Sequence, residues 1–159
     1  MLRSGQDERM DDVEGCFACD LSHGRVHLPG GTIHRTDHWV VEHCVGPLGV
    51  GTLIVKPMRH VVHVADLGEA EAAELGPLLR RASSIVMQLA QPEQVYVCLW
   101  SHGPVHIHFV VQPVSATLMA DFAAHGPKLQ VAMFESRTPL DEGQVDAFAD
   151  ATRQEFRRV

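Results

Sequence analysis

Lysine is scarce in this sequence, which contains only Lys56 and Lys128 among its 159 residues. With histidine counted as neutral, the formal net charge at pH 7 is -7. Binding along a nucleic-acid phosphate backbone relies on clustered lysine and arginine. The composition therefore argues against nucleic acid as the main partner. A small anionic ligand is still compatible with it, because one pocket can be locally positive on an acidic protein.

Long apolar runs are also missing. No stretch approaches the roughly 20 apolar residues that span a bilayer, and the polar first residues have no apolar run typical of a signal peptide. We therefore expect a soluble, cytoplasmic protein with no membrane contact and a mobile tail over residues 1–14. The chain has no internal repeats, low-complexity tracts or obvious linkers, which favours a single domain over residues 15–159.

Histidine and cysteine, in contrast, are placed where chemistry is expected. Cys16 and Cys19 form a close pair, which in a reducing compartment indicates a metal or redox site. This spacing lets two thiolates bind one tetrahedral zinc ion, which then needs two more ligands. The candidates are His106 and either His60 or His63, both of which follow a predicted strand.

Apolar periodicity predicts the order strand, strand, strand, helix, strand, strand, helix. This order indicates an α+β fold, with an antiparallel sheet of about five strands on which a long helix and a C-terminal helix pack. The strands are expected within 32–43 (two strands, turning near 36–37), 50–55, 95–100 and 105–111, and the helices within 66–90, 115–124 and 141–158. Asp66 is the expected cap of the long helix, and residues 126–134 have no assigned structure.

Two histidines lie in the last predicted strand. Because alternate side chains of a strand share a face, His106 and His108 point to one side while Ile107 and Phe109 point into the core. A His-x-His pair on a strand is typical of metal or phosphate chemistry, although two half-exposed surface histidines would give the same pattern.

A tight turn from Ser101 to Pro104 is predicted to join the last two strands into a hairpin. The backbone N–H groups between Ser101 and Gly103, with the side chains of Ser101 and His102, could bind phosphate oxygens. An ordinary hairpin turn is an equally good interpretation. Trp100, just before the turn, is a candidate for stacking a base, although packing against the hairpin is the simpler expectation.

Three elements in this order resemble the histidine-triad superfamily. They are the Cys16-x-x-Cys19 pair, the strand from Gly51 that ends in Pro-x-x-His at His60, and the His106-x-His108 strand. The resemblance covers residues 16–113. It implies an antiparallel sheet with helices packed on it, often in a homodimer, and a small-molecule nucleotide as the substrate.

The resemblance also implies roles for the histidines. The family carries three alternate histidines where this chain has two, so we align His106 with the first and leave Val110 at the third. Pro113 then falls where family strands end, and the first histidine is a zinc ligand in zinc-containing members. The implied structural zinc site consists of Cys16, Cys19, His60 and His106. His108 is left as the catalytic nucleophile.

The implied activity is hydrolysis of nucleotide phosphates or nucleotidyl transfer, on substrates such as diadenosine polyphosphates or phosphoramidates. It proceeds through a nucleotidyl-histidine, which suits a neutral imidazole near neutral pH. Glu42 lies on the strand that supplies an acidic group to the ribose in the family. It joins Ser101, His102 and Gly103 as an expected substrate contact. Lys56 and Arg59, which flank Pro57, are expected in solvent.

Two other interpretations fit the same residues. Family members also carry an Asn on the strand before the triad, and this chain lacks it. A non-catalytic nucleotide-binding module that kept the zinc framework would explain both this absence and Val110. The spacing His106-x-His108-x-x-x-Gln112 also resembles the cupin metal motif, whose last position is Glu. That resemblance implies a small barrel and a metal enzyme.

Overall fold

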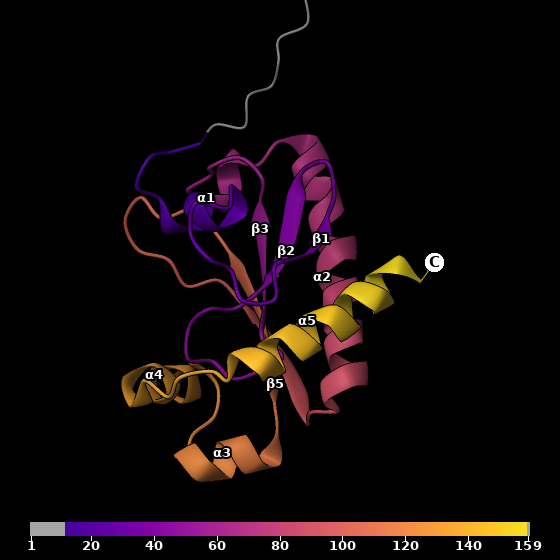
Figure 1. The fold of residues 1–159 in the computed structure, drawn as a ribbon. Helices are drawn as coiled ribbons and strands as arrows, with labels where there is room; N and C mark the ends of the chain where they lie inside the picture. Colours follow the sequence, from indigo (N-terminus) through magenta and orange to yellow (C-terminus); the bar gives the residue numbers. More distant parts are fainter. Residues whose placement is uncertain (1–11, 159) are drawn as a thin grey trace, which may run out of the picture.

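The structure is a computed structural model that describes residues 12–158 (Figure 1). The predicted mobile tail over residues 1–14 therefore falls almost entirely outside the described residues. Asp12, where the description begins, forms an ion pair with Arg25. Within the described range, no helix has both the length and the apolar character needed to cross a membrane.

A five-stranded antiparallel sheet forms the centre of the fold, in the order β1-β2-β3-β5-β4. The predicted α+β architecture is confirmed. The strands are β1 (Thr32–Arg35), β2 (Trp39–His43), β3 (Leu53–Pro57), β4 (Gln94–Cys98) and β5 (Phe109–Val114). The β1–β2 turn at residues 36–37 lies where the sequence predicts it.

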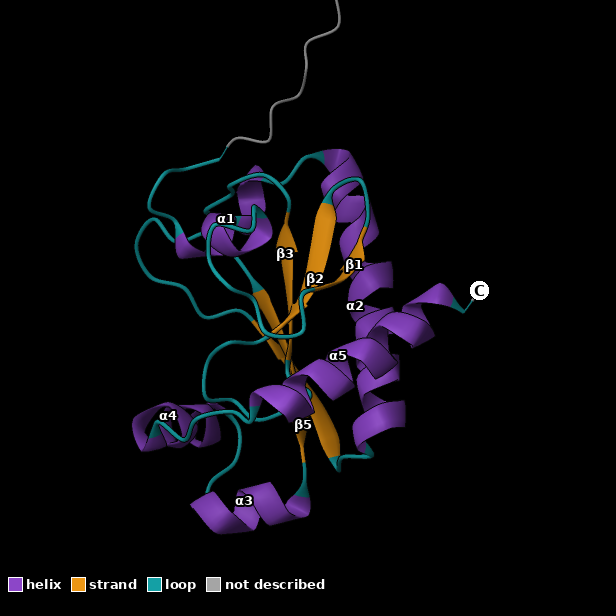
Figure 2. Ribbon diagram, in the orientation of Figure 1, coloured by secondary structure: helices purple, strands orange, loops and turns teal. Residues whose placement is uncertain are grey.

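Helices cover both faces of the sheet. They are α1 (Phe17–Ser22), α2 (Glu69–Ala90), α3 (Ala116–Phe122), α4 (Pro127–Ser136) and α5 (Glu142–Arg157), with a 3-10 turn η1 (Val64–Asp66) before α2. Figure 2 shows α2 and α5 together on one side of the strands and α1, α3 and α4 on the other. The predicted long helix and C-terminal helix are α2 and α5.

The face that α2 and α5 cover carries the main core. Alternate residues of β2 and β3 point into it, among them Trp39, Val41 and Leu53, all fully buried. The indole N–H of Trp39 donates to the carbonyl oxygen of Glu71 in α2 at 2.9 Å, so the large ring is buried without an unpaired donor. This apolar layer holds the sheet against α2.

The apolar cluster on the opposite face is smaller, and that face carries more polar side chains. Val110 and Val114 of β5 pack with Leu129 and Met133 of α4. The sequence did not predict α4, although Gly126-Pro127 is a start signal, because proline suits the first turn of a helix. α4 therefore covers the face of β5 that carries Val110 and Val114.

The predicted histidine strand is wrong in its bounds. β5 begins at Phe109, so His106 and His108 precede it in a segment without regular secondary structure. That segment leaves β4, and the backbone N–H of Ile107 donates instead to Val61 at 2.8 Å. The predicted tight turn is likewise a longer connection over residues 99–108. β5 also continues through Pro113 to Val114. Pro113 lies beyond Val111, which is the last residue of β5 that pairs with β3.

Three smaller differences concern strand and helix ends. β4 is an edge strand with Val97 45% exposed, and it spans Gln94–Cys98 where a strand within 95–100 is predicted. β3 starts at Leu53 and includes Pro57. α2 starts at Glu69 and Gly68 is its N-cap, with the backbone N–H of Gly68 donating to the Glu71 carboxylate at 2.7 Å. Asp66, the predicted cap, instead ends η1.

The buried environment of His43 leads to a prediction about how stability depends on pH. Its ring is 1% exposed and bridges two backbone groups: Nδ1 donates to the Cys44 carbonyl, and Nε2 accepts from the N–H of Gly51, both at 2.8 Å. Burial lowers the pKa of His43, partly offset by the bond to Cys44. A protonated ring could not accept from Gly51.

We therefore expect the folded protein to keep His43 neutral below the ordinary histidine pKa of about 6.5. Since the unfolded chain then binds more protons, the contribution of His43 to stability is complete above about pH 6.5 and falls below it, by at most about 1.4 kcal/mol per pH unit. NMR titration of the ring checks this. A His43 ring that titrates above pH 6.5 would contradict it.

Candidate active site and metal centre

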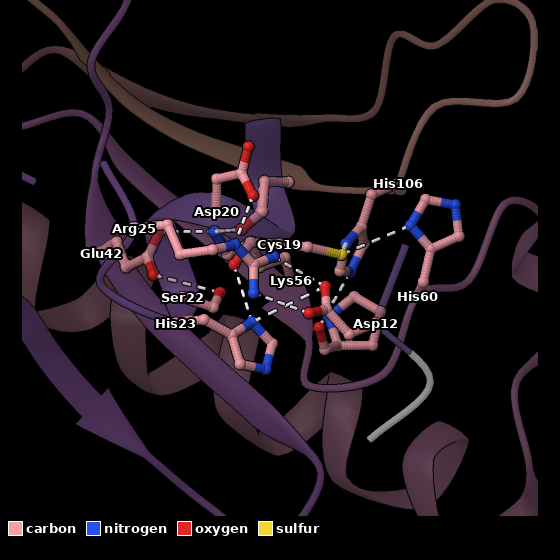
Figure 3. Close-up of polar contacts among 12 residues, drawn as sticks. Asp12, Cys19, Asp20, Ser22, His23, Arg25, Glu42, Lys56, His60 and His106 are labelled. Atoms are coloured by element: carbon pink, nitrogen blue, oxygen red, sulfur yellow. Dashed lines mark hydrogen bonds and ion pairs between the residues drawn. The ribbon is translucent and has the colours of Figure 1, made fainter. Parts of the chain in front are cut away.

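Two cysteines and two histidines from three parts of the chain meet beside α1. Cys16 caps α1 and Cys19 lies one turn further, His60 follows β3, and His106 lies ahead of β5. The Sγ atom of Cys19 is 3.5 Å from Nδ1 of His60 and 3.5 Å from Nδ1 of His106 (Figure 3). One ligand atom from each of the four lies within 4.8 Å of the others.

His106 is oriented as a ligand should be. Its Nε2–H donates to the carbonyl oxygen of Pro57 at 2.9 Å, so Nδ1 carries the lone pair that faces Cys19. Such an outer hydrogen bond is typical of metal-bound histidine. Burial lowers the pKa of His106 to about 4 and keeps the ring neutral. Burial also raises the pKa of the Cys19 thiol to about 11, so metal binding would displace its proton.

The donor set of two thiols and two imidazoles fits tetrahedral zinc. His63, the alternative to His60, is exposed and precedes η1, apart from the four clustered residues. Of the two histidines, the fold therefore brings His60 into the cluster. The backbone after β3 brings His60 back toward α1 and carries His63 outward.

Ion pairs tie down the segments that carry Cys16, Cys19 and His60. Arg25, just after α1, forms ion pairs with Asp12 and Asp20, both at 2.7 Å. Arg59, next to His60, donates to both carboxylate oxygens of Glu71 in α2. The expectation that Arg59 lies free in solvent is wrong, since it ties the segment before His60 to α2.

A buried ion pair lies beneath α1. The Nζ atom of Lys56 is 2.7 Å from the carboxylate of Glu42 and donates to the Ala18 carbonyl at 2.7 Å. Both side chains are about 1% exposed, so the expectation that Lys56 lies in solvent is also wrong. The burial of Glu42 argues against the predicted ribose contact and favours a structural role with Lys56. Ser22 is a further partner of Glu42, at 3.4 Å.

His108 lies two residues beyond His106 and is half-buried. Its Nδ1 is 3.1 Å from the carbonyl oxygen of His106, the geometry of a donated hydrogen bond. In that tautomer Nε2 carries the lone pair. The backbone that orients His108 is therefore the backbone of the buried residue His106.

Ser101, His102 and Gly103 are exposed on the connection between β4 and β5. Within residues 12–158, no intramolecular hydrogen bond uses their backbone N–H groups. Gly103 has a φ of +72°, which favours glycine at this turn. The segment therefore presents backbone donors on the same connection that carries His108.

Comparison with solved structures gives consistent matches. A Hit-like protein from Bartonella henselae has a TM-score of 0.69 at 11% identity, covering 91% of this chain and 98% of its own. A hypothetical histidine triad nucleotide-binding protein from Sulfolobus tokodaii has a TM-score of 0.66 at 13% identity, covering 88% and 91%. This chain has the histidine-triad fold.

A third match is a Zn-bound histidine triad family protein from Mycobacterium smegmatis, with a TM-score of 0.62, 16% identity and coverage of 89% and 92%. In sequence, no family model and no curated protein matches the chain. The identities are low, so these matches establish the histidine-triad fold and leave substrate and mechanism to be argued from the site.

The histidine-triad fold excludes the cupin-like alternative. Gln112, the expected last metal ligand of that motif, is fully buried in β5 and donates to the Leu48 carbonyl at 3.1 Å. His108 is not among the four clustered donors. Val110, at the third triad position, is 5% exposed and packs under α4, so it presents no polar group to a ligand.

The buried ion pair of Glu42 and Lys56 leads to a prediction about stability. Lys56→Met leaves the Glu42 carboxylate buried opposite a methyl group, and we expect a loss of about 3–5 kcal/mol in the free energy of unfolding. In the double variant Glu42→Leu/Lys56→Met no buried charge is left, so the loss should be smaller. Denaturant unfolding of both variants measures this. A loss below about 1 kcal/mol for Lys56→Met would show that the pair is not tight.

Proposed function

We propose that this protein acts on nucleotide phosphates, as a hydrolase or a nucleotidyltransferase, with His108 as the nucleophile. The observation that carries the proposal is the hydrogen bond between Nδ1 of His108 and the carbonyl of His106. A nucleophilic imidazole needs one nitrogen held by an acceptor so that the other presents its lone pair. Half-burial lets a phosphate approach that nitrogen.

In the proposed reaction, Nε2 of His108 attacks the α-phosphorus of a diadenosine polyphosphate or a phosphoramidate. The new N–P bond replaces the bond from phosphorus to the leaving phosphate or amine, which departs with its electron pair and takes up a proton. Water or an acceptor hydroxyl then attacks phosphorus and releases His108. The backbone N–H groups of Ser101, His102 and Gly103 are the proposed partners of the phosphate oxygens.

We also propose that Cys16, Cys19, His60 and His106 hold a structural zinc ion. When bound, the ion would join α1, the end of β3 and the approach to β5 at one point. His106 would then be fixed at both ring nitrogens, by the metal and by Pro57. A fixed His106 carbonyl in turn fixes the orientation of His108.

Metal analysis tests the zinc proposal. We expect one zinc ion per chain with two sulfur and two nitrogen ligands in X-ray absorption, and a lower melting temperature after chelation. Cys19→Ser should abolish stoichiometric binding. Cys98→Ser is the matched control, because Cys98 contacts Gln130 rather than the cluster, and it should keep the metal. Full zinc content in Cys19→Ser would rule out the proposed ligand set.

A second candidate function is nucleotide binding without catalysis. Buried Val110 favours it, because a third histidine would have offered a donor to the phosphate. Nucleotide binding with no turnover and no adduct would support this candidate over the first.

The catalytic proposal is tested by His108→Asn. We expect turnover of diadenosine tetraphosphate and adenosine phosphoramidate to fall by about a thousandfold or more, because the other groups of the site cannot act on the substrate without the nucleophile. Intact mass after acid-free quenching should show a nucleotidyl adduct on the wild type alone. His125→Asn, a change at an exposed histidine before α4, is the matched control and should keep full activity. Full turnover in His108→Asn would refute the nucleophile assignment.

A further inference from the structure

Trp100 lies at the start of the connection that carries His108, two residues beyond Cys98 at the end of β4. Gln130 of α4 contacts the side chains of both Cys98 and Trp100. Both side chains therefore point to the sheet face that packs against α4.

The Trp100 ring is exposed yet fixed. It is 59% exposed, the largest exposed fraction among the large hydrophobic side chains of residues 12–158. Its indole N–H donates to Oε1 of Gln130 in α4 at 2.7 Å. An exposed indole on a connecting segment has no packing reason for a fixed orientation, so the anchor needs another explanation.

The anchor is itself buried and held. Gln130 is 4% exposed, and its Nε2 donates to Oε1 of Gln112 at 3.0 Å. Gln112 donates in turn to the Leu48 carbonyl. A chain of buried amides thus runs from the sheet through α4 to the indole. Buried amides are costly unless fully paired, and this chain is fully paired.

A groove of about 450 Å³ adjoins the ring. It runs between β4 and the start of α4, lined by the β4 residues with Trp100, Gly126 and Pro127. Trp100 immediately precedes Ser101, the first of the proposed phosphate contacts. A ligand whose phosphate lies on residues 101–103 would therefore reach the indole with a neighbouring ring.

We propose that Trp100 is a stacking platform for a nucleobase of the substrate, with Gln130 as the residue that positions it. This inference rests on the proposed nucleotide substrate and assigns its base to a place on the protein. A flat, planar group matches an indole whose orientation is preset, and an aromatic platform takes any base because every base has a π-face. The base is stacked on one face, and its sugar leads toward residues 101–103.

Calorimetric titration with two probes separates base from phosphate. The probes are AMP and ribose 5-phosphate, which carry the same phosphate with and without a base. In the wild type AMP should bind more tightly. Trp100→Ala should weaken AMP binding by about tenfold or more and leave ribose 5-phosphate unchanged. Trp100→Phe should keep part of the AMP preference, since it retains a ring but loses the bond to Gln130.

Phe134→Ala is the matched control. Phe134 is a 52% exposed aromatic on α4, outside this groove, and its removal should change neither affinity. Unchanged AMP affinity in Trp100→Ala would overturn the platform while leaving the proposed function intact, as would an equal loss for both probes. A wild type that binds neither probe would overturn both proposals. If Trp100→Ala converted a dimer into a monomer, the ring would lie in an interface between copies, and the platform would be overturned.

Discussion

The meeting of Cys19 with His60 and His106 is the contact on which the rest of the site depends. It joins α1, the end of β3 and the segment before β5, which are far apart in the sequence. The bond from His106 to the Pro57 carbonyl fixes the ring, and the carbonyl of His106 in turn holds His108. The orientation of His108 therefore depends on the buried residue His106 through two hydrogen bonds, one from the His106 ring to Pro57 and one from His108 to the His106 carbonyl.

Polar pairs, rather than apolar packing alone, shape the face of the sheet that carries the site. Glu42 and Lys56 lie under α1, and Gln112 of β5 pairs with Gln130 of α4. Within residues 12–158, no buried side-chain nitrogen or oxygen lacks a partner. An unpaired group there would cost more than the pair gains. Each pair therefore ties one helix to the sheet.

The cysteine pair of the candidate metal site was predictable from the sequence, because its chemistry depends on short spacing. Cys16-x-x-Cys19 specifies one turn of chain around a shared ion, whatever the surrounding fold. By spacing alone His60 and His63 were equivalent, since each follows a strand at a plausible distance, and the resemblance to the family favoured His60. The backbone path after β3 places His60 in the cluster. Arg59 and Lys56 were misjudged because charged residues beside a proline are usually solvated, and their partners Glu71 and Glu42 are distant in sequence.

The sequence by itself determined the alternation of strands and helices, the cysteine pair and the two histidines. Each of these follows from residue type and local spacing, which act over a few residues. The tertiary structure alone decided that His106 and His108 leave the sheet before β5, that Glu42 is buried with Lys56, and that α4 covers the face of β5 that carries Val110. These features depend on partners such as Val61 for Ile107 and Gln130 for Trp100. A long-range partner leaves no periodic signal in the chain, so only packing in three dimensions could select it.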